Sequence, residues 1–129
     1  MLKLIVDENI AFAGEAFKQF GDVTLLPGRK INNAVLRNTD ILFIRSITNV
    51  NKGLLKNTSV KFVGTATIGT DHIDLDYLKK NSINFADSKG CNAFSVAEYV
   101  VASLLNLSLK FDFSLKNKSI GIVGVGNVG

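Results

Sequence analysis

Three glycines near the end of the sequence have the spacing of a phosphate-binding turn. Gly124, Gly126 and Gly129 fit the pattern G-x-G-x-x-G, and the apolar run 120–123 leads directly into them. In a dinucleotide-binding unit, the first glycine permits a tight turn, the second lets the backbone approach a pyrophosphate, and the third lets the next helix pack closely on its strand. An ordinary turn at the end of a strand is the alternative, because glycine-rich turns are common.

A second set of residues has the chemistry of an anion site. Arg45 and Ser46 follow one predicted strand, and Thr67 follows the next. In open α/β sheets ligands collect at the carboxyl ends of the strands, so these side chains are expected to lie together. The guanidinium group of Arg45 suits phosphate or carboxylate, and the two hydroxyl groups add donors. Gly69 is expected to let the backbone turn its N–H groups toward the same anion.

Several reactive residues also have structural explanations. Arg45 is equally well explained as a surface cation paired with Asp7 or Glu8 at the end of the first strand. His72, the only histidine of the chain, is expected to have a structural or helix-capping role. Cys91 is expected to be a small packed residue near the start of a helix. The acidic residues lie on different predicted elements, so no metal site is expected.

Short apolar runs alternate with helical patterns along the first 90 residues. Strands are predicted at 2–6, 23–26, 41–44, 61–65 and 84–86, and helices at 11–20, 33–37, around 54–55 and at 75–80. The helix 11–20 is expected to present one apolar face made of Phe12, Ala16, Phe17 and Phe20. The run 41–44 is apolar throughout, which predicts a central strand. Regular alternation with short connections predicts an α/β fold with a flavodoxin-like parallel sheet.

One long helix is predicted from Asn92 to about Lys110. About half of its circumference is apolar, which is more than a helix covering one small sheet requires. Its start is expected to be capped either by Asn92 or by the S-x-x-E pair Ser95 and Glu98. It is either a core helix of the first domain or a helix shared with a second domain or subunit, and its direct connection to the glycine motif favours the second.

Composition excludes several classes of protein. The chain has 129 residues, of which 47% are hydrophobic and 20% are charged, so it can bury a core. The lysines and arginines behind its net charge of +4 are scattered, which indicates mild attraction for anionic metabolites rather than nucleic-acid binding. A single cysteine suits a reducing cytoplasm. The sequence contains neither a signal-peptide pattern nor an apolar run of the ~20 residues that a membrane helix needs.

Five segments together resemble the NAD-dependent D-2-hydroxyacid dehydrogenases. They are LIVDEN at 4–9, RSIT at 45–48, KFVGTATIGTDHID at 61–74, GCNAFSVAEYV at 90–100 and IGIVGVGNVG at 120–129. The resemblance implies that Ser46 and Thr67 contact a small phosphorylated hydroxy acid and that Arg45 lies in the same site. It also implies that NAD contacts the turn formed by Gly124, Gly126, Asn127, Val128 and Gly129.

The same resemblance implies a division of the chain. Residues 1–92 would form the N-terminal part of a substrate-binding domain. Residues 93–129 would form a linking helix and the first strand of a Rossmann NAD-binding domain. The catalytic arginine, glutamate and histidine of the family are expected beyond Gly129, so the chain alone is expected to be inactive.

Two further expectations concern assembly and the alternative class. The apolar half of the long helix and the terminal strand would lack partners in this chain, which predicts a homodimer. The alternative function is a non-catalytic flavodoxin-like module that binds anions or acts as a signalling receiver. The acidic pair after the first strand suits a receiver, but Arg45 and Ser46 stand where a receiver needs an aspartate.

Overall fold

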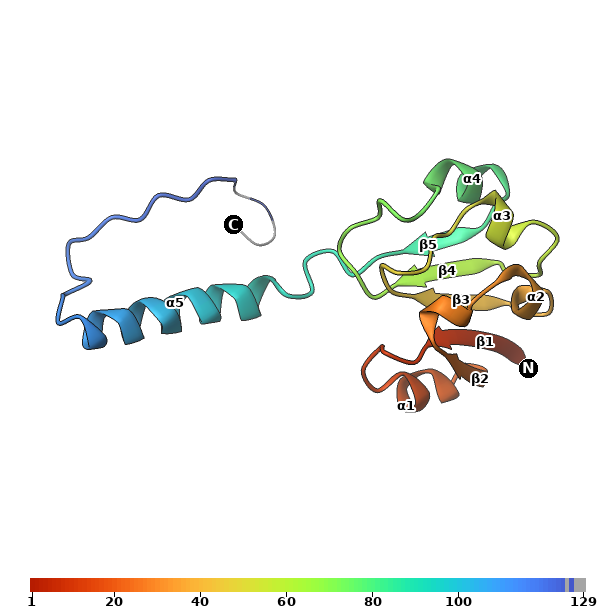
Figure 1. The fold of residues 1–129 in the computed structure, drawn as a ribbon, viewed down its shortest axis with the longest axis horizontal. Coiled ribbons are helices and arrows are strands. Elements are labelled where there is room, and N and C mark those ends of the chain that lie inside the picture. Colours follow the sequence, from red (N-terminus) through yellow and green to blue (C-terminus); the bar gives the residue numbers. More distant parts are fainter. Residues whose placement is uncertain (125, 127–129) are drawn as a thin grey trace. The chain divides into compact units, whose positions relative to one another are not determined.

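The computed structural model describes residues 1–124 and 126 (Figure 1). The chain divides into two compact units, Met1–Ser88 and Lys89–Gly129. The first unit is a five-stranded sheet in the order β2-β1-β3-β4-β5, and all neighbouring strands are parallel. Its strands are β1 (Leu2–Asp7), β2 (Gly21–Leu26), β3 (Ile41–Ile44), β4 (Phe62–Thr65) and β5 (Asn84–Ala86). The predicted α/β flavodoxin-like sheet, with β3 at its centre, is therefore confirmed.

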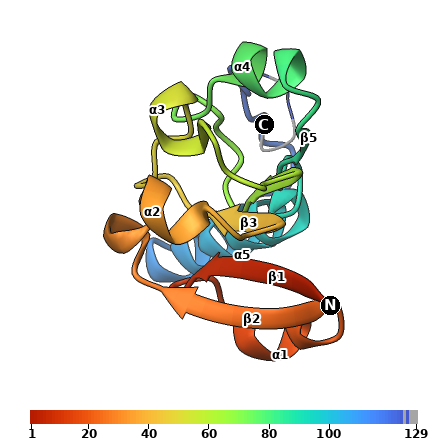
Figure 2. The same ribbon diagram turned by 90° about the vertical axis from the view of Figure 1, so that its right-hand side faces the viewer.

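Helices lie on both faces of this sheet (Figure 2). They are α1 (Ala13–Lys18), α2 (Asn33–Leu36), α3 (Lys52–Leu55) and α4 (Leu75–Lys80), with a 3-10 turn η1 at Gly28–Lys30. One face of the sheet is covered by α2, α3 and α4. Each of these helices buries one leucine there, and these leucines pack in the same core as Leu42 and Ile44 of β3. They are Leu36, Leu55 and Leu78. On the other face, α1 packs against β1 through Ala13 and Phe17. These two apolar layers give the first unit a core of its own.

Side-chain caps explain where the short helices begin. Asn32 accepts hydrogen bonds from two backbone amides at the start of α2, Asn51 accepts one at the start of α3, and Asp74 accepts one at the start of α4. Each cap satisfies backbone N–H groups that the first helical turn leaves without an intrahelical partner. The predicted bounds of α4 and β5 are confirmed residue for residue.

The prediction for the first helix was wrong in length and in its apolar face. The helix spans only Ala13–Lys18, because Phe12 precedes it with a positive φ of 57°, outside the helical region. Phe12 and Phe20 are 79% and 56% exposed, and Ala16 is also exposed. Ala13 is the residue of this helix that is buried.

The second unit contains the predicted long helix, α5 (Ala93–Lys110). Asn92 is at its N-cap position but makes no side-chain capping bond, and Ser95 and Glu98 lie inside the helix, so neither predicted cap is formed. No residue of α5 is buried. Within the described part of the chain, no helix is long and apolar enough to cross a membrane.

The predicted strand at 120–123 is not formed. Residues 118–122 have no regular secondary structure, and Ile120, Ile122 and Val123 are exposed. An apolar, β-branched run has the propensity for a strand, but a strand also needs a neighbour to accept its backbone hydrogen bonds. None of the sheet pairings includes this segment.

Candidate functional site

The parallel sheet places the ends of its five strands along one edge of the first unit. The order of strands reverses between β1 and β3, because β2 lies on one side of β1 while β3, β4 and β5 follow on the other. In open α/β sheets such a reversal marks the ligand crevice at the carboxyl ends. Asp7 ends β1 there, and Arg45 directly follows β3. We call this region the carboxyl edge, meaning residues 7–9, 26–28, 45–48, 65–72 and 86–88.

Arg45 and Ser46 are both exposed at the carboxyl edge. The alternative ion pair with Asp7 is not formed, because Asp7 Oδ1 accepts bonds from Asn9 and its Oδ2 has no partner. Arg45 makes no ion pair with Glu8 in the described part of the chain either. The guanidinium group therefore keeps its donors available to a ligand.

Thr67 belongs to a short chain of hydrogen bonds after β4. Its Oγ1 lies 2.7 Å from Thr65 Oγ1 and donates to the carbonyl oxygen of Gly69 at 3.2 Å. Thr65 Oγ1 also lies 3.4 Å from Nε2 of His72. Ser88, which follows β5, holds this group in place, because its Oγ donates to the Thr65 carbonyl at 3.0 Å and its N–H to the Thr67 carbonyl at 3.3 Å.

His72 is held by its backbone as well as by its ring. Its carbonyl oxygen accepts a hydrogen bond from Val50 N at 2.8 Å, next to a parallel bridge between Val50 and Ile73. These bonds agree with the expected structural role, but the helix cap is Asp74 and not His72. Burial lowers the pKa of His72 below its ordinary value of 6.5, while the nearby carboxylate of Asp71 raises it to a lesser extent.

Asp7 and Gly28 support the segment that carries Ser46. Asp7 is only 1% exposed, and its unpartnered Oδ2 faces Gly28 so closely that a Cβ at Gly28 would lie 2.5 Å away. The same Cβ would lie 2.8 Å from Cγ1 of Ile47. The buried hydroxyl of Thr48 donates to the carbonyl oxygen of Gly28 at 3.1 Å. Residues 45–48 therefore contact Gly28 through Ile47 and Thr48, and Gly28 packs closely against the side chain of Asp7.

Sequence reasoning missed Thr65, Ser88 and Gly28 as members of this edge. A polar residue at the end of a predicted apolar strand was the available signal for Thr65. Ser88 and Gly28 gave no such signal, because their roles depend on contacts between distant segments. Gly69 is not in the left-handed region and a Cβ there would meet its nearest atom at 4.0 Å, so its role in turning N–H groups toward an anion stays a prediction.

Two further predictions concern residues in the second unit. Cys91 is exposed and free, so the expectation of a packed residue was wrong. Gly124 has a φ of +82°, a conformation that suits glycine and fits the tight turn of a dinucleotide-binding motif. Gly126 has open space where a Cβ would lie. The predicted NAD contacts of residues 127–129 lie outside the described residues.

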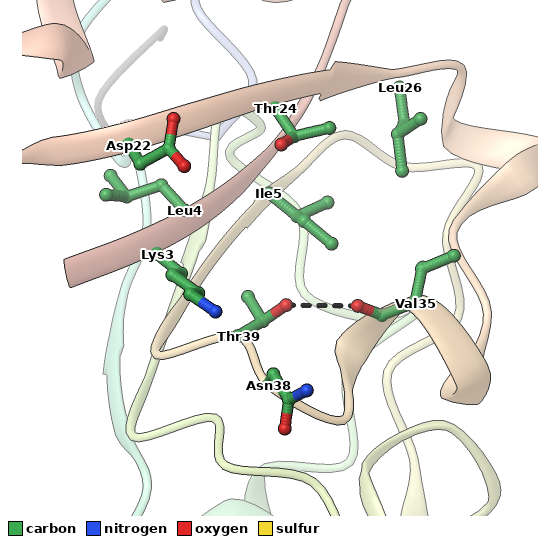
Figure 3. Close-up of a pocket in the computed structure, with 9 residues that line it drawn as sticks. All are labelled: Lys3, Leu4, Ile5, Asp22, Thr24, Leu26, Val35, Asn38 and Thr39. Atoms are coloured by element: carbon green, nitrogen blue, oxygen red, sulfur yellow. Dashed lines mark hydrogen bonds between the residues drawn. The ribbon is translucent and has the colours of Figure 1, made fainter. Parts of the chain in front are cut away.

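The surface of the first unit has several hollows. A hollow of about 320 Å³ lies beside the edge strand β2, between Lys3, Asp22 and the turn at Thr39, whose hydroxyl donates to Val35 (Figure 3). Its lining runs along β2 from Asp22, near the amino end, to Leu26 at the carboxyl end, and it includes none of Arg45, Ser46 and Thr67. A smaller hollow of about 160 Å³ opens at the carboxyl edge, where Thr65 and Ser88 are among its lining residues.

The described residues contain no group of three or more His, Cys, Asp or Glu side chains that could hold a metal ion. The side chains of the carboxyl edge include a cationic fork, several hydroxyl groups and an imidazole. Such a set binds anions by charge-assisted and neutral hydrogen bonds.

The chain is similar to known proteins in both sequence and fold. The model of the D-isomer specific 2-hydroxyacid dehydrogenase catalytic domain matches residues 4–124. Erythronate-4-phosphate dehydrogenase of Chromohalobacter salexigens is 56% identical over 128 residues, which are 99% of this chain and 33% of that protein. The enzyme of the same name from Photorhabdus laumondii is 49% identical over 128 residues, covering 99% of this chain and 34% of that protein. The chain thus spans about a third of the length of the curated relatives it matches.

Solved structures share the fold at lower identity. D-lactate dehydrogenase from Escherichia coli matches with a TM-score of 0.71 and 16% identity, over 98% of this chain and 49% of that one. D-lactate dehydrogenase from Aquifex aeolicus, solved with NAD and lactic acid, matches with a TM-score of 0.66 and 23% identity, over 98% of this chain and 45% of that one. Since the family model covers nearly the whole sequence, this chain belongs to the D-isomer specific 2-hydroxyacid dehydrogenase family.

Proposed function

We propose that this chain supplies the substrate-binding part of a dehydrogenase that oxidises 4-phospho-D-erythronate. The product would be 2-oxo-3-hydroxy-4-phosphobutanoate, and the reaction would serve pyridoxal 5'-phosphate synthesis in the cytoplasm. The similarity to erythronate-4-phosphate dehydrogenases over almost all of this chain supports the substrate. The single observation that carries the proposal is the exposed Arg45, which has no acidic partner in the described part of the chain and stands beside Ser46 at the carboxyl edge. Family membership disfavours the receiver-type alternative.

In this proposal Arg45, Ser46 and Thr67 hold the anionic groups of the substrate. A guanidinium fork meets phosphate or carboxylate with two parallel hydrogen bonds, which are stronger than bonds between neutral groups. The hydroxyl of Ser46 would add a donor next to it. Thr67 would add a second one by releasing the Gly69 carbonyl to which it now donates.

NAD is the proposed cofactor, and the turn that begins at Gly124 would receive its pyrophosphate. The positive φ of Gly124 and the open space at Gly126 fit that group. Asn127, Val128 and Gly129 stay proposed cofactor contacts by family resemblance. When bound, NAD accepts a hydride from the carbon that carries the hydroxyl group. Arg45, Ser46 and Thr67 would orient the substrate for that step.

Sulfate titration of the chain tests the anion site. Sulfate should shift the backbone NMR signals of residues 45–48 and 67–70 at low salt, where charged contacts contribute most. Arg45→Ala should remove these shifts. Arg37→Ala is the matched control, because Arg37 is also exposed but follows α2 rather than a strand of the sheet. Shifts that map away from the carboxyl edge, or that survive Arg45→Ala, would refute the site.

We further propose that the 129-residue chain has no dehydrogenase turnover by itself, because the family's proton-transferring groups are expected outside it. NADH formation from 4-phosphoerythronate can be followed by absorbance. Turnover that disappears in His72→Ala, but not in a variant of an exposed lysine, would overturn this proposal.

The exposed apolar side of α5 supports a homodimer. Apolar residues are exposed along the whole helix, and they include Phe94, Val101, Leu105 and Leu109. At ~25 cal/mol per Å² of apolar surface removed from water, covering several such side chains contributes a few kcal/mol to association. We therefore propose that α5 packs against its copy about a two-fold axis. Sedimentation at several concentrations tests this, and a monomer at high concentration would refute it.

A further inference from the structure

The hydrogen bonds around Thr67 can be oriented by counting protons. A threonine hydroxyl has one proton to donate and can accept further bonds through its oxygen. Thr67 donates its proton to the Gly69 carbonyl, which can only accept. When Thr67 donates in this way, the 2.7 Å bond between the two threonines uses the proton of Thr65, although either oxygen can donate in that bond by itself. In the same arrangement the proton in the 3.4 Å contact between Thr65 and His72 comes from Nε2, which requires the tautomer that carries its proton there.

This order makes a relay with one direction. His72 Nε2–H donates to Thr65, Thr65 donates to Thr67, and Thr67 donates to the Gly69 carbonyl. Each donated bond polarises the next hydroxyl and makes it a better donor. Only the last bond can be exchanged for a bond to an anion without leaving a hydroxyl proton in the relay unpaired.

We infer that His72 is a positioning residue for anion binding, which acts through Thr65 to direct the hydroxyl proton of Thr67 toward a bound phosphate or sulfate. The inference rests on the proposed function, because it deepens the role of Thr67 in that site. His72 does not touch the anion in this arrangement. The Nε2–H of His72 keeps the hydroxyl proton of Thr65 directed at Thr67 and the hydroxyl proton of Thr67 directed away from Thr65.

The surroundings of Thr65 make the relay rigid. Thr65 is only 4% exposed, so its hydroxyl has little access to water as a substitute partner. Ser88 holds the Thr65 carbonyl, and the Val50 amide holds the carbonyl of His72. If the Nε2 donor is removed, the Thr65 hydroxyl can rotate and accept from Thr67 instead. Thr67 would then meet the anion with a lone pair rather than with a proton.

Sulfate affinity of the full 129-residue chain tests the inference, read from the Thr67 amide signal at low salt. His72→Gln is the conservative variant, because its side-chain amide places a donor nitrogen at about the reach of Nε2. It should bind sulfate nearly as well as the wild type. His72→Leu lacks a donor and should bind about two- to tenfold more weakly, the effect of one neutral hydrogen bond.

Thr65→Val removes the middle of the relay at nearly constant volume. It should weaken sulfate binding by a similar factor. The double variant of Thr65→Val and His72→Leu should be no weaker than either single variant, because both remove the same path. Losses that add in the double variant would mean that the two residues act independently, and would overturn the inference.

A pH series separates the relay from simple charge attraction. Sulfate keeps its charge between about pH 5.5 and 8, and in that range His is the side chain that ordinarily titrates. The charged groups of the surrounding segments include Asp71 on the same loop, Asp74 at the start of α4, Asp87 and Lys89 after β5, and Arg45 after β3. Affinity should rise as His72 is protonated, and this rise should vanish in His72→Gln and become small in Thr65→Val. A rise that is unchanged in Thr65→Val would show attraction through space and would overturn the relay.

The same experiments distinguish failure of the inference from failure of the proposed function. If wild-type chain gives no sulfate response at residues 45–48 and 67, the anion site itself is refuted. If the wild type responds there but His72→Leu binds equally well, only the relay is refuted. The ¹⁵N shifts of the His72 ring give a readout without any anion, since the relay requires the neutral ring to carry its proton on Nε2. A proton on Nδ1 would overturn it.

Discussion

Replacing Gly28 with alanine should destabilise the first unit by overpacking. The new Cβ would lie 2.5 Å from Asp7 Oδ2 and 2.8 Å from Ile47 Cγ1, both closer than real Cβ contacts. Ile47 is 52% exposed and can move aside, but Asp7 is 1% exposed and ends β1 inside the sheet. The strain therefore falls on Asp7 and on the backbone of the 3-10 turn. Overpacking of this kind costs about 1–3 kcal/mol of unfolding free energy.

Urea unfolding followed by far-ultraviolet circular dichroism measures this loss, and hydrogen exchange of β3 amides reports on the first unit alone. Gly14→Ala is a matched control of opposite sign. It lies in α1, where a Cβ would meet Leu25 at an ordinary 3.7 Å, so alanine should stabilise by about 0.5–1 kcal/mol through its helix propensity. If Gly28→Ala proved neutral or stabilising, as Gly14→Ala should be, the close packing of Asp7, Gly28 and Ile47 would be refuted.

Three other perturbations have definite expected outcomes. Asn32→Ala removes the cap of α2 and should lower the free energy of unfolding in urea by about 1 kcal/mol. No change would mean that water satisfies the two capped amides as well as the Asn32 side chain does. Because burial lowers the pKa of His72 in the folded chain, the unfolded chain takes up its proton at higher pH. Stability should therefore be fully present above 6.5 and fall as the pH drops toward the folded pKa, and His72→Gln should lack this component. Val101→Glu combined with Leu105→Glu places charges on exposed apolar positions of α5 and should give a monomer in sedimentation. A dimer that persists in this variant would show that α5 does not form the interface.

Much of the fold was predictable because its signals are local. The strand 41–44 is a short apolar run bounded by polar residues, and Asp74 begins α4 with a cap that is visible in the sequence. Helix α1 was overestimated because Phe12, despite its helical spacing, occupies a left-handed turn. A strand was predicted at 120–123 from residue propensity alone. Strand formation also depends on a neighbouring strand, which no local sequence pattern reveals.

The candidate site was predictable in position but not in mechanism. Arg45, Ser46 and Thr67 follow the ends of parallel strands, and topology alone brings such ends to one edge. The relay was not predictable, because His72 reaches Thr65 only after the loop folds back and Val50 pairs beside Ile73. The packing of Gly28 against Asp7 was not predictable either, because the two residues are 21 positions apart and no sequence pattern indicates that they meet.

The position of β1 between β2 and β3 has a consequence for synthesis on the ribosome. β1 is made first, yet its backbone pairs on one side with β2 and on the other with β3, and Lys3 N already bonds to Asp40, 37 residues later. At about 5–20 residues per second, β1 waits roughly 2–7 s for its second partner. During that interval the apolar side chains of Leu4 and Val6, fully buried in the finished sheet, stay accessible to chaperones and to other nascent chains.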